Sequence, residues 1–279
     1  MTKVDIRSDW DSFIVEVSDN VATVIVSTEK RGNLLGPDFW HEVPLLFEQL
    51  GRDDEVRAII LAAAGPHFSY GIDLTLMTSM FGRAFQDGGL ATERHALRRN
   101  IVVAQKAASA LADCPKPVIA AVHGWCIGAA VDLISGADIR FASTDAIFSV
   151  REVKIGIVAD LGSLQRLPQL IGQGHTRELA MTGDDVTAER ASELGLVNLV
   201  LPDHKRLLDH AREVAERIAA NPPLAVQGIK HILNVADHDF VSNGLNYVAT
   251  WNAVTLPSHD VNEAISAVTQ KRAATFRGQ

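Results

Sequence analysis

Three acidic residues stand in apolar stretches near the middle of the chain: Asp132, Glu152 and Asp160. A carboxyl group in apolar surroundings has a raised pKa and can exchange a proton near neutral pH. A pair of such groups can take a proton from one carbon atom and give a proton to another. The spacing also allows Asp132 to be a capping or core-paired carboxylate, and Glu152 and Asp160 to be surface carboxylates.

Small residues surround the first of these acids, in the segment VIAAVHGWCIGAAVDLI. We expect a buried strand over Val118 to Val122, a turn at Gly124, and a helix from about Gly128 to Gly136. The free backbone N–H groups at the start of such a helix suit an oxygen anion. Asp132 would lie about one turn into this helix.

A second glycine-containing loop follows an earlier strand, in the segment HFSYGIDL. Gly71, between Ser69 and Asp73, permits tight backbone geometry and could aim another N–H group at a ligand. The segment is equally compatible with an ordinary loop.

Composition indicates a globular protein and excludes several classes. Of the 279 residues, 47% are apolar and 22% are charged, and the net charge is −8. This balance opposes nucleic-acid binding, and the longest apolar run, near Val118 to Val122, is too short to cross a membrane. Cys114 and Cys126 are expected to be reduced thiols, and neither end of the chain carries a recognisable address, so we expect a cytoplasmic protein.

Signals for metals and nucleotides are also missing from the sequence. The ten histidines form no HExxH or Cys/His cluster, so no metal is expected. The segment Gly172-Gln173-Gly174 is not a GxGxxG motif, and no phosphate-binding P-loop or GxSxG motif is present.

The elements that position these residues alternate between strands and helices, which predicts an α/β fold with largely parallel pairing. Strands are expected at 21–27, 56–63, 118–122, 139–142, 147–150 and 196–201. Helices are expected at 37–50, 93–113, 128–136, 165–171, 177–182 and 187–194. From 204 to 272 the chain is expected to be helical, with breaks at Pro222-Pro223 and Pro257. We therefore expect a body over residues 1–203 and a helical region over 204–279 that serves oligomerisation.

Six segments in order resemble the crotonase superfamily of enoyl-CoA hydratases and isomerases across nearly the whole chain. They are KRGNLL, FSYGIDL, KPVIAAVHGWCIGAAVDL, ADIRFASTDAIFSVREVKIGIVAD, GSLQRLPQLIG and AERASELGLVNLV. The resemblance implies a crotonase-like spiral of ββα turns with a helical C-terminal trimerisation region, assembled as a homotrimer or homohexamer. It also implies an oxyanion hole for a thioester carbonyl, formed by the N–H groups of Ile72 and Ala129, with Gly128 as the alternative to Ala129.

The acids place the chain in one branch of that superfamily. Hydratases have Glu where Asp132 and Glu152 stand and a small residue where Asp160 stands. The Asp, Glu, Asp pattern resembles the Δ3,5-Δ2,4-dienoyl-CoA isomerases instead, as do SVREVKIGIVADLGSLQRLP and NYVATWNAVTLPSHDV. This resemblance implies a 1,5-proton shift in an acyl-CoA thioester, with Glu152 acting at C2, Asp160 protonating C6, and Asp132 tuning the pair. No cofactor is implied, because CoA is part of the substrate.

Further residues are candidates for substrate binding by the same resemblance. They are Ser69, Tyr70, Gly71, Asp73, Leu74, Lys30 and Arg31, with Lys271 and Arg272 as further phosphate candidates and Met77, Met80, Phe81 and Phe85 as candidates for the acyl tunnel. Solvated charges and core packing are the alternatives for these groups. Two departures from the family are Gly128-Ala129-Ala130, where relatives often have three glycines, and Tyr70, where relatives have a small residue.

Two other functions are compatible with the sequence. A hydratase could hold water between Asp132 and Glu152. A non-catalytic relative that binds acyl-CoA or RNA could use the arginines at 94, 98 and 99, although the net charge opposes RNA.

Overall fold

The computed structural model describes residues 9–28, 30–73 and 91–278. Leu74 and the four tunnel candidates lie outside these residues. A six-stranded sheet has the order β1-β2-β3-β4-β6-β9, and a three-stranded sheet has the order β5-β7-β8. The strands of the larger sheet are β1 (Phe13–Ser18), β2 (Val21–Val26), β3 (Ala58–Ala63), β4 (Val118–Val122), β6 (Ile139–Ser143) and β9 (Leu199–Leu201).

Pairing from β2 through β9 is parallel, as the alternation of strands and helices predicts. The exception is β1, which sequence analysis missed and which pairs with β2 in antiparallel register. Asp19 and Asn20 join the two strands with φ angles of 51° and 62°. Such a pair is typical of a two-residue hairpin turn, so the sequence did carry a signal for β1.

The two faces of the larger sheet are covered by different helices. On one face, α7 (His204–Ala219) presents Leu207, Ala211, Ala215 and Ala219 to the sheet. On the other face lie α1 (Pro37–Arg52), α3 (Ala91–Asp113) and α4 (Ala129–Ser135), with their apolar side chains in the main core. Burial on both faces is why the central strands are continuous apolar runs.

The smaller sheet contains the strand that directly precedes α4. Its strands are β5 (Trp125–Ile127), β7 (Ile147–Ser149) and β8 (Val186–Thr187). We expected the chain to pass directly from Gly124 into the helix, so the short strand β5 is a correction. It pairs in parallel with β7, and this pairing places the start of α4 next to the segment that contains Glu152.

The remaining predictions are confirmed with small changes in their ends. A 3-10 helix, η2 (Glu152–Ile155), follows β7; α5 (Ser163–Thr182) is interrupted by a non-helical Gly172, and α6 (Ala188–Leu194) follows. The last strand begins at Leu199 rather than Leu196, and the Leu196 carbonyl accepts a hydrogen bond from Arg140 Nε at 2.9 Å instead.

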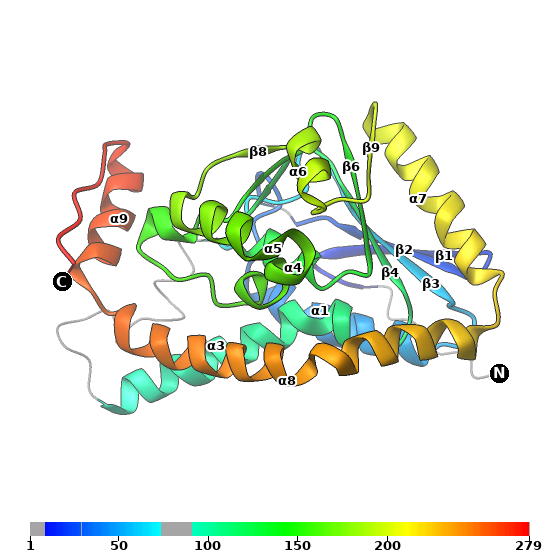
Figure 1. Cartoon of the computed structure of the whole chain (residues 1–279), viewed down its shortest axis with the longest axis horizontal. Coiled ribbons are helices and arrows are strands. Elements are labelled where there is room, and N and C mark those ends of the chain that lie inside the picture. Colours follow the sequence, from blue (N-terminus) through cyan, green and yellow to red (C-terminus); the bar gives the residue numbers. More distant parts are fainter. Residues whose placement is uncertain (1–8, 29, 74–90, 279) are drawn as a thin grey trace.

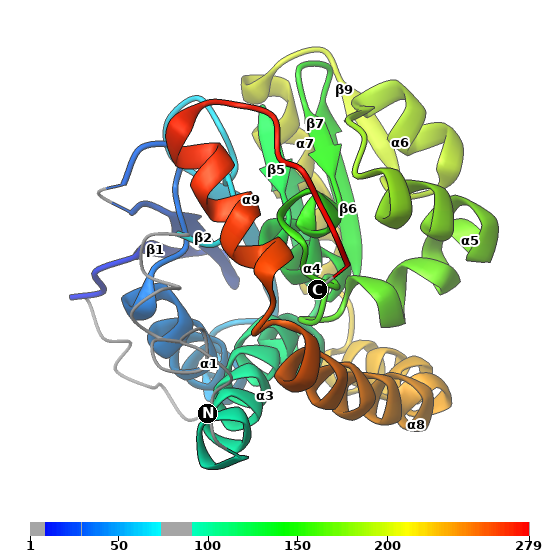
Figure 2. The same cartoon turned by 90° about the vertical axis from the view of Figure 1, so that its left-hand side faces the viewer.

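The C-terminal part is helical, with breaks at the expected prolines. After α7 come α8 (Pro223–Thr255) and α9 (His259–Gln270). Figure 1 shows α8 lying alongside α3 at the base of the molecule, and Figure 2 shows α9 above these two helices, on the side that faces the viewer. Val261 of α9 packs against Gly156, directly after η2. The division of function after residue 203 stays a prediction.

Candidate active site

At the start of α4, the side chain of Glu152 lies close to the backbone of Gly128. Gly128 is its N-cap, with φ 57° and ψ −122°, a combination that residues with a Cβ atom rarely adopt. The Gly128 N–H group donates to Ser149 O of β7 at 2.9 Å. A Cβ atom added at Gly128 would lie 3.3 Å from Glu152 Oε1. The Glu152 carboxyl group therefore lies beside the first turn of α4.

Asp132 is a buried carboxylate with a defined partner. Its exposed fraction is 1%, and Oδ1 accepts a hydrogen bond from the backbone N–H of Ser163, the first residue of α5, at 2.6 Å. Burial raises the pKa of Asp132, whereas the hydrogen bonds of Ser163 and the charge of Arg166 lower it. Asp132 is thus a carboxylate paired within the core, and the same side chain also lies near the second acid.

Glu152 opens η2, and its Oε2 atom is enclosed without a hydrogen-bond partner among the described residues. The residue as a whole is half-buried. Burial raises the pKa of Glu152 well above its usual value, and the charges of Asp132 and Asp160 raise it further. The three carboxyl groups therefore lie within electrostatic reach of one another.

Asp160 lies in the loop before α5 and is held by two amide side chains. Asn252 Nδ2, from α8, donates to Asp160 Oδ2 at 2.7 Å, and Gln105 Nε2, from α3, donates to the Asp160 carbonyl at 2.8 Å. Burial raises the pKa of Asp160 to about 7, although the Asn252 hydrogen bond lowers it. Glu152 and Asp160 are therefore not simple surface carboxylates. Sequence analysis identified neither Asn252 nor Gln105.

The Ser69 to Asp73 segment lies next to the start of α4. A Cβ atom at Gly71, where φ is 82°, would lie 2.6 Å from Ile127 O and 3.4 Å from Ala129 N. The N–H of Leu35 donates to Gly71 O at 2.8 Å, and Leu35 O accepts from Asp73 N at 3.3 Å. Because neighbouring residues in a parallel bridge direct their N–H groups to opposite sides, the N–H of Ile72 faces away from Leu35.

Other candidate binding residues gather around the same loop. Lys30 Nζ lies 3.2 Å from Asp73 Oδ2, and the Tyr70 ring fills the space where a side chain at Gly32 would stand. Arg31 is exposed. Ser69 is buried, and its hydroxyl donates to Asn33 O at 2.7 Å, so its contacts are those of a loop anchor.

The two C-terminal phosphate candidates stand at the end of α9. Arg272 is held by the Glu263 carboxylate through two nitrogen–oxygen contacts, of 2.5 and 2.7 Å. Lys271 caps the helix with a left-handed backbone conformation. The Arg272 guanidinium is therefore already paired with a carboxylate.

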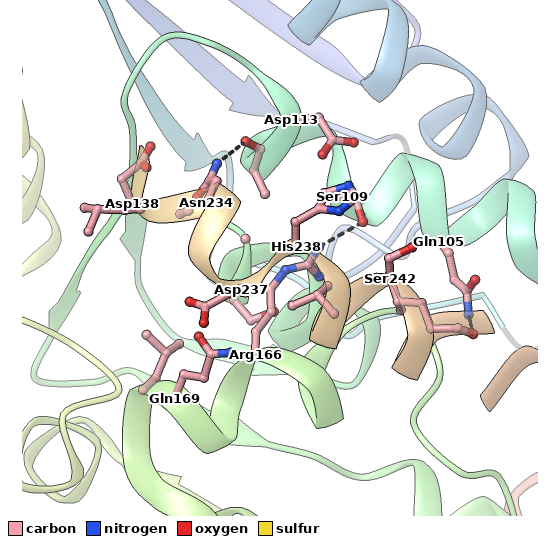
Figure 3. Close-up of a pocket in the computed structure, with 18 of the residues that line it drawn as sticks. Gln105, Ser109, Asp113, Asp138, Arg166, Gln169, Asn234, Asp237, His238 and Ser242 are labelled. Atoms are coloured by element: carbon pink, nitrogen blue, oxygen red, sulfur yellow. Dashed lines mark hydrogen bonds between the residues drawn. The ribbon is translucent and has the colours of Figure 1, made fainter. Parts of the chain in front are cut away.

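A hollow of about 570 Å³ lies between α3, α5 and α8 (Figure 3). Two of its lining residues also contact the acids: Gln105 donates to Asp160 O, and Arg166 acts electrostatically on Asp132. Asp132, Glu152 and Asp160 are not among the described residues that line it. The hollow is therefore next to the carboxyl cluster but is not lined by it.

In residues 9–28, 30–73 and 91–278, no group of three His, Cys, Asp or Glu side chains is arranged to hold a metal ion. No helix in those ranges is long and apolar enough to cross a membrane. The expectation of no metal stays a prediction.

The chain has a six-stranded and a three-stranded sheet, and a helix that begins at a glycine with acids clustered beside it. These features define a protein of the crotonase fold. The chain belongs to the enoyl-CoA hydratase/isomerase family, whose pattern matches residues 16–279. The enoyl-CoA hydratase/isomerase from Xanthobacter autotrophicus has the same fold, with a TM-score of 0.82 and 26% identity, covering 94% of each chain.

Similar curated proteins carry a more specific name. A peroxisomal Δ(3,5)-Δ(2,4)-dienoyl-CoA isomerase from Arabidopsis thaliana is 42% identical over 271 residues, covering 97% of this chain and 95% of the relative. The mitochondrial Δ(3,5)-Δ(2,4)-dienoyl-CoA isomerase from Homo sapiens is 39% identical over 261 residues, covering 93% of this chain and 79% of the relative. The resemblance stated from sequence motifs is therefore confirmed.

Proposed function

We propose that this chain is a Δ3,5-Δ2,4-dienoyl-CoA isomerase that moves a proton between C2 and C6 of an acyl-CoA thioester. The observation that carries the proposal is the cluster of Asp132, Glu152 and Asp160, in which the charges of both aspartates act on Glu152. The names of the relatives from Arabidopsis thaliana and Homo sapiens support it. A proton shift needs one carboxyl group to accept a proton and another to donate one.

The oxyanion hole is formed by the N–H groups of Ile72 and Ala129. The close approach of Gly71 to Ala129 N supports this assignment, as does the direction of the Ile72 N–H group away from Leu35. Ala129 is the first residue of α4, so its N–H has no acceptor within that helix. Two fixed amides stabilise the negative charge that develops on the thioester oxygen when the proton leaves C2.

Glu152 acts at C2 and Asp160 at C6. Glu152 Oε1 lies beside Gly128, the residue before Ala129. C2 is bonded directly to the carbon of the thioester carbonyl, whose oxygen accepts the hydrogen bond of the Ala129 N–H group. C6 lies four carbons further along the acyl chain, so a different acid must reach it. We assign Asp160 to this role because burial raises its pKa to about 7, so it can donate a proton at neutral pH.

Asp132 controls the charge of the pair. The Ser163 N–H group and Arg166 favour its ionised form, and its negative charge raises the pKa of Glu152. Three ionised carboxyl groups in one buried site repel one another strongly, so the cluster retains protons and its three groups titrate as a coupled set. Asp132 thereby keeps one proton within the Glu152 and Asp160 pair.

Substrate binding uses the loop beside α4. Lys30 and Arg31 approach the phosphates of CoA, and Tyr70 and Asp73 lie between them and the thioester. Lys30 is half-exposed and forms an ion pair with Asp73. This pair places a positive charge beside the loop from Ser69 to Asp73. The substrate brings its own CoA, and the reaction consumes no cofactor.

The assembly is a homotrimer or homohexamer in the cytoplasm. The α8 helix supports an oligomer because many of its large apolar side chains are exposed, and soluble monomers rarely expose large apolar patches. They are Leu224, Ile229, Ile232, Leu233, Val235, Phe240, Tyr247, Trp251 and Val254. Light scattering of the purified protein gives the subunit number, and a monomeric mass at micromolar concentration would contradict this assignment.

The direct test incubates the protein with 3,5-dienoyl-CoA substrates of several chain lengths. The conjugated 2,4-dienoyl product absorbs more ultraviolet light, so absorbance should rise. Asp160→Asn should abolish the rise while thioester binding is retained. No rise with any chain length, together with fast hydration of crotonyl-CoA that survives Asp160→Asn, would instead indicate a hydratase.

A further inference from the structure

The C-terminal helix α8 reaches the carboxyl cluster through one side chain, Asn252. This residue has no exposed surface. Its Nδ2 atom donates to Asp160 Oδ2 at 2.7 Å and to Val158 O at 2.8 Å. An amide nitrogen carries two hydrogen atoms, so both are used, and both hold the loop that contains Asp160.

The contact binds one of the two carboxyl oxygens of Asp160 to the protein. With Oδ2 committed to Asn252, the carboxyl group cannot rotate freely, and Oδ1 is the oxygen available for proton exchange. A donor also favours the ionised form of its acceptor carboxylate. Among the described residues, the titratable groups that act on Asp160 are Asp132 of α4 and Glu152 of η2. Its neighbours on α3 and α8 are the neutral amides Gln105 and Asn252.

We propose that Asn252 is a positioning residue of the active site, which orients the Asp160 carboxyl group and sets the pH at which it gives up its proton. The proposal rests on the proposed function for the role of Asp160 as the proton donor to C6. It makes the helical region that begins at 204 a part of the reaction centre as well as a surface for assembly.

Gln105, which Figure 3 shows at the edge of the neighbouring hollow, provides a matched control because it also binds Asp160. Like Asn252 it is a buried primary amide that donates two hydrogen bonds, to Asp160 O at 2.8 Å and to Leu245 O at 2.9 Å. It differs in one respect, because it contacts the main chain of Asp160 and leaves the carboxyl group alone. Asn252→Leu and Gln105→Leu therefore remove similar bonds with different consequences for the carboxyl group.

The first measurement follows the Asp160 carboxyl directly and needs no substrate. Protein labelled with ¹³C-aspartate is titrated by NMR, and the Asp160 signal is identified by its loss in Asp160→Asn. In Asn252→Leu the titration midpoint should move to higher pH by about one to two units, the effect of losing a hydrogen bond to a charged group. In Gln105→Leu the midpoint should move by less than about half a unit. If Asn252→Leu does not fold, Asn252→Ala is used, which removes the amide without added bulk.

The second measurement is the pH dependence of isomerisation. Asp160 must be protonated to donate to C6, so activity decreases as pH rises through its pKa. A higher pKa of Asp160 in Asn252→Leu therefore shifts this decrease in activity to higher pH. Because the carboxyl group is also less well oriented, kcat falls about tenfold or more with little change in KM.

An unchanged carboxyl midpoint in both Asn252 variants would overturn the proposal, as would equal shifts in Asn252→Leu and Gln105→Leu. A wild-type protein without isomerase activity would overturn the proposed function alone. In that case the NMR titration still decides whether Asn252 controls Asp160.

Discussion

Asp132 Oδ1 accepts the backbone N–H of Ser163 at 2.6 Å, so a buried carboxylate in α4 is bound to the first residue of α5. The N-terminus of a helix stabilises negative charge through its free N–H groups and its dipole. The contact offsets part of the rise in pKa that burial causes in Asp132, whose exposed fraction is 1%. It also fixes the position of the loop that ends at Asp160 relative to α4.

Replacing Asp132 by Asn should lower the pKa of Glu152, because the negative charge of Asp132 raises it. Glu152 must be ionised to take the C2 proton, so the low-pH limb of the isomerase rate should move to lower pH. We expect kcat to decrease about tenfold, which corresponds to about 1.4 kcal/mol in the barrier. Asp132→Glu keeps the charge and is the matched control, for which the limb should stay in place. A limb that does not move in Asp132→Asn would contradict the tuning role.

Replacing Gly128 by Ala should damage the site without any change of charge. The new Cβ would lie 3.3 Å from Glu152 Oε1, at a backbone conformation with φ 57° and ψ −122°. We expect a loss of about 1–3 kcal/mol in the free energy of unfolding and at least about a tenfold loss of kcat/KM.

Gly174 offers the control for this substitution. It stands in α5, and a Cβ atom there would meet no atom within 4 Å. Gly174→Ala should keep full activity and increase stability by up to about 1 kcal/mol, since Ala favours helices over Gly. Equal behaviour of the two variants would show that the close approach at Gly128 has no importance. Denaturant unfolding and steady-state kinetics measure both effects.

The elements of the sheet could be predicted because their signals are local. The runs at Val21 and Val118 are β-branched or apolar over five or more residues, and prolines mark both breaks in the C-terminal helices. The strand Trp125–Ile127 has only three residues, too few for a periodic pattern to be visible. This strand is stabilised by its pairing with β7, which is distant in the sequence, and such pairing leaves no pattern in a segment this short.

The residues of the site also differ in whether the sequence could predict them. Asp132 and Asp160 could be predicted because a charged residue within an apolar run requires a partner or a function. Asn252 could not, because it is one of several polar residues on a helix that is exposed over much of its length. Its partner is 92 positions away in the sequence. Only the packing of α8 against α3 places this amide beside Asp160.

Lys230 attaches α8 to the body of the protein, and Lys230→Met should destabilise the fold strongly. Its Nζ atom donates to Leu111 O at 2.8 Å, Lys116 O at 3.0 Å and Asp138 Oδ2 at 2.8 Å. The Lys230 side chain is 5% exposed. Removing one partner of a buried ion pair leaves the others without hydrogen bonds, which costs about 3–5 kcal/mol.

The exposed pair of Lys205 and Asp209 is the matched control. Its ions are also 2.8 Å apart, but the lysine side chain is 84% exposed. Lys205→Met should change the free energy of unfolding by less than about 1 kcal/mol. Urea denaturation of both variants measures the difference, and a similar small effect for Lys230→Met would mean that this ion pair does not hold α8 in place.

Asp160 should make the protein less stable at high pH than a variant that lacks its carboxyl group. Its pKa is about 7 in the folded protein and about 3.9 in an unfolded chain, so the folded state binds the proton more tightly. The free energy of unfolding therefore decreases as pH rises from about 4 to about 7, by about 1.4 kcal/mol for each pH unit.

Asp160→Asn is neutral at every pH and keeps an oxygen that can accept from Asn252. Its stability should lie within about 1 kcal/mol of that of the wild type near pH 4, where the wild-type carboxyl is protonated in the folded state and about half protonated in the unfolded state. At pH 8 the variant should be more stable by a few kcal/mol, although it should have lost isomerase activity. Urea denaturation at the two pH values tests this, and the measurement at pH 4 is the internal control. A difference that is the same at both pH values would show that the carboxyl group of Asp160 carries no buried charge.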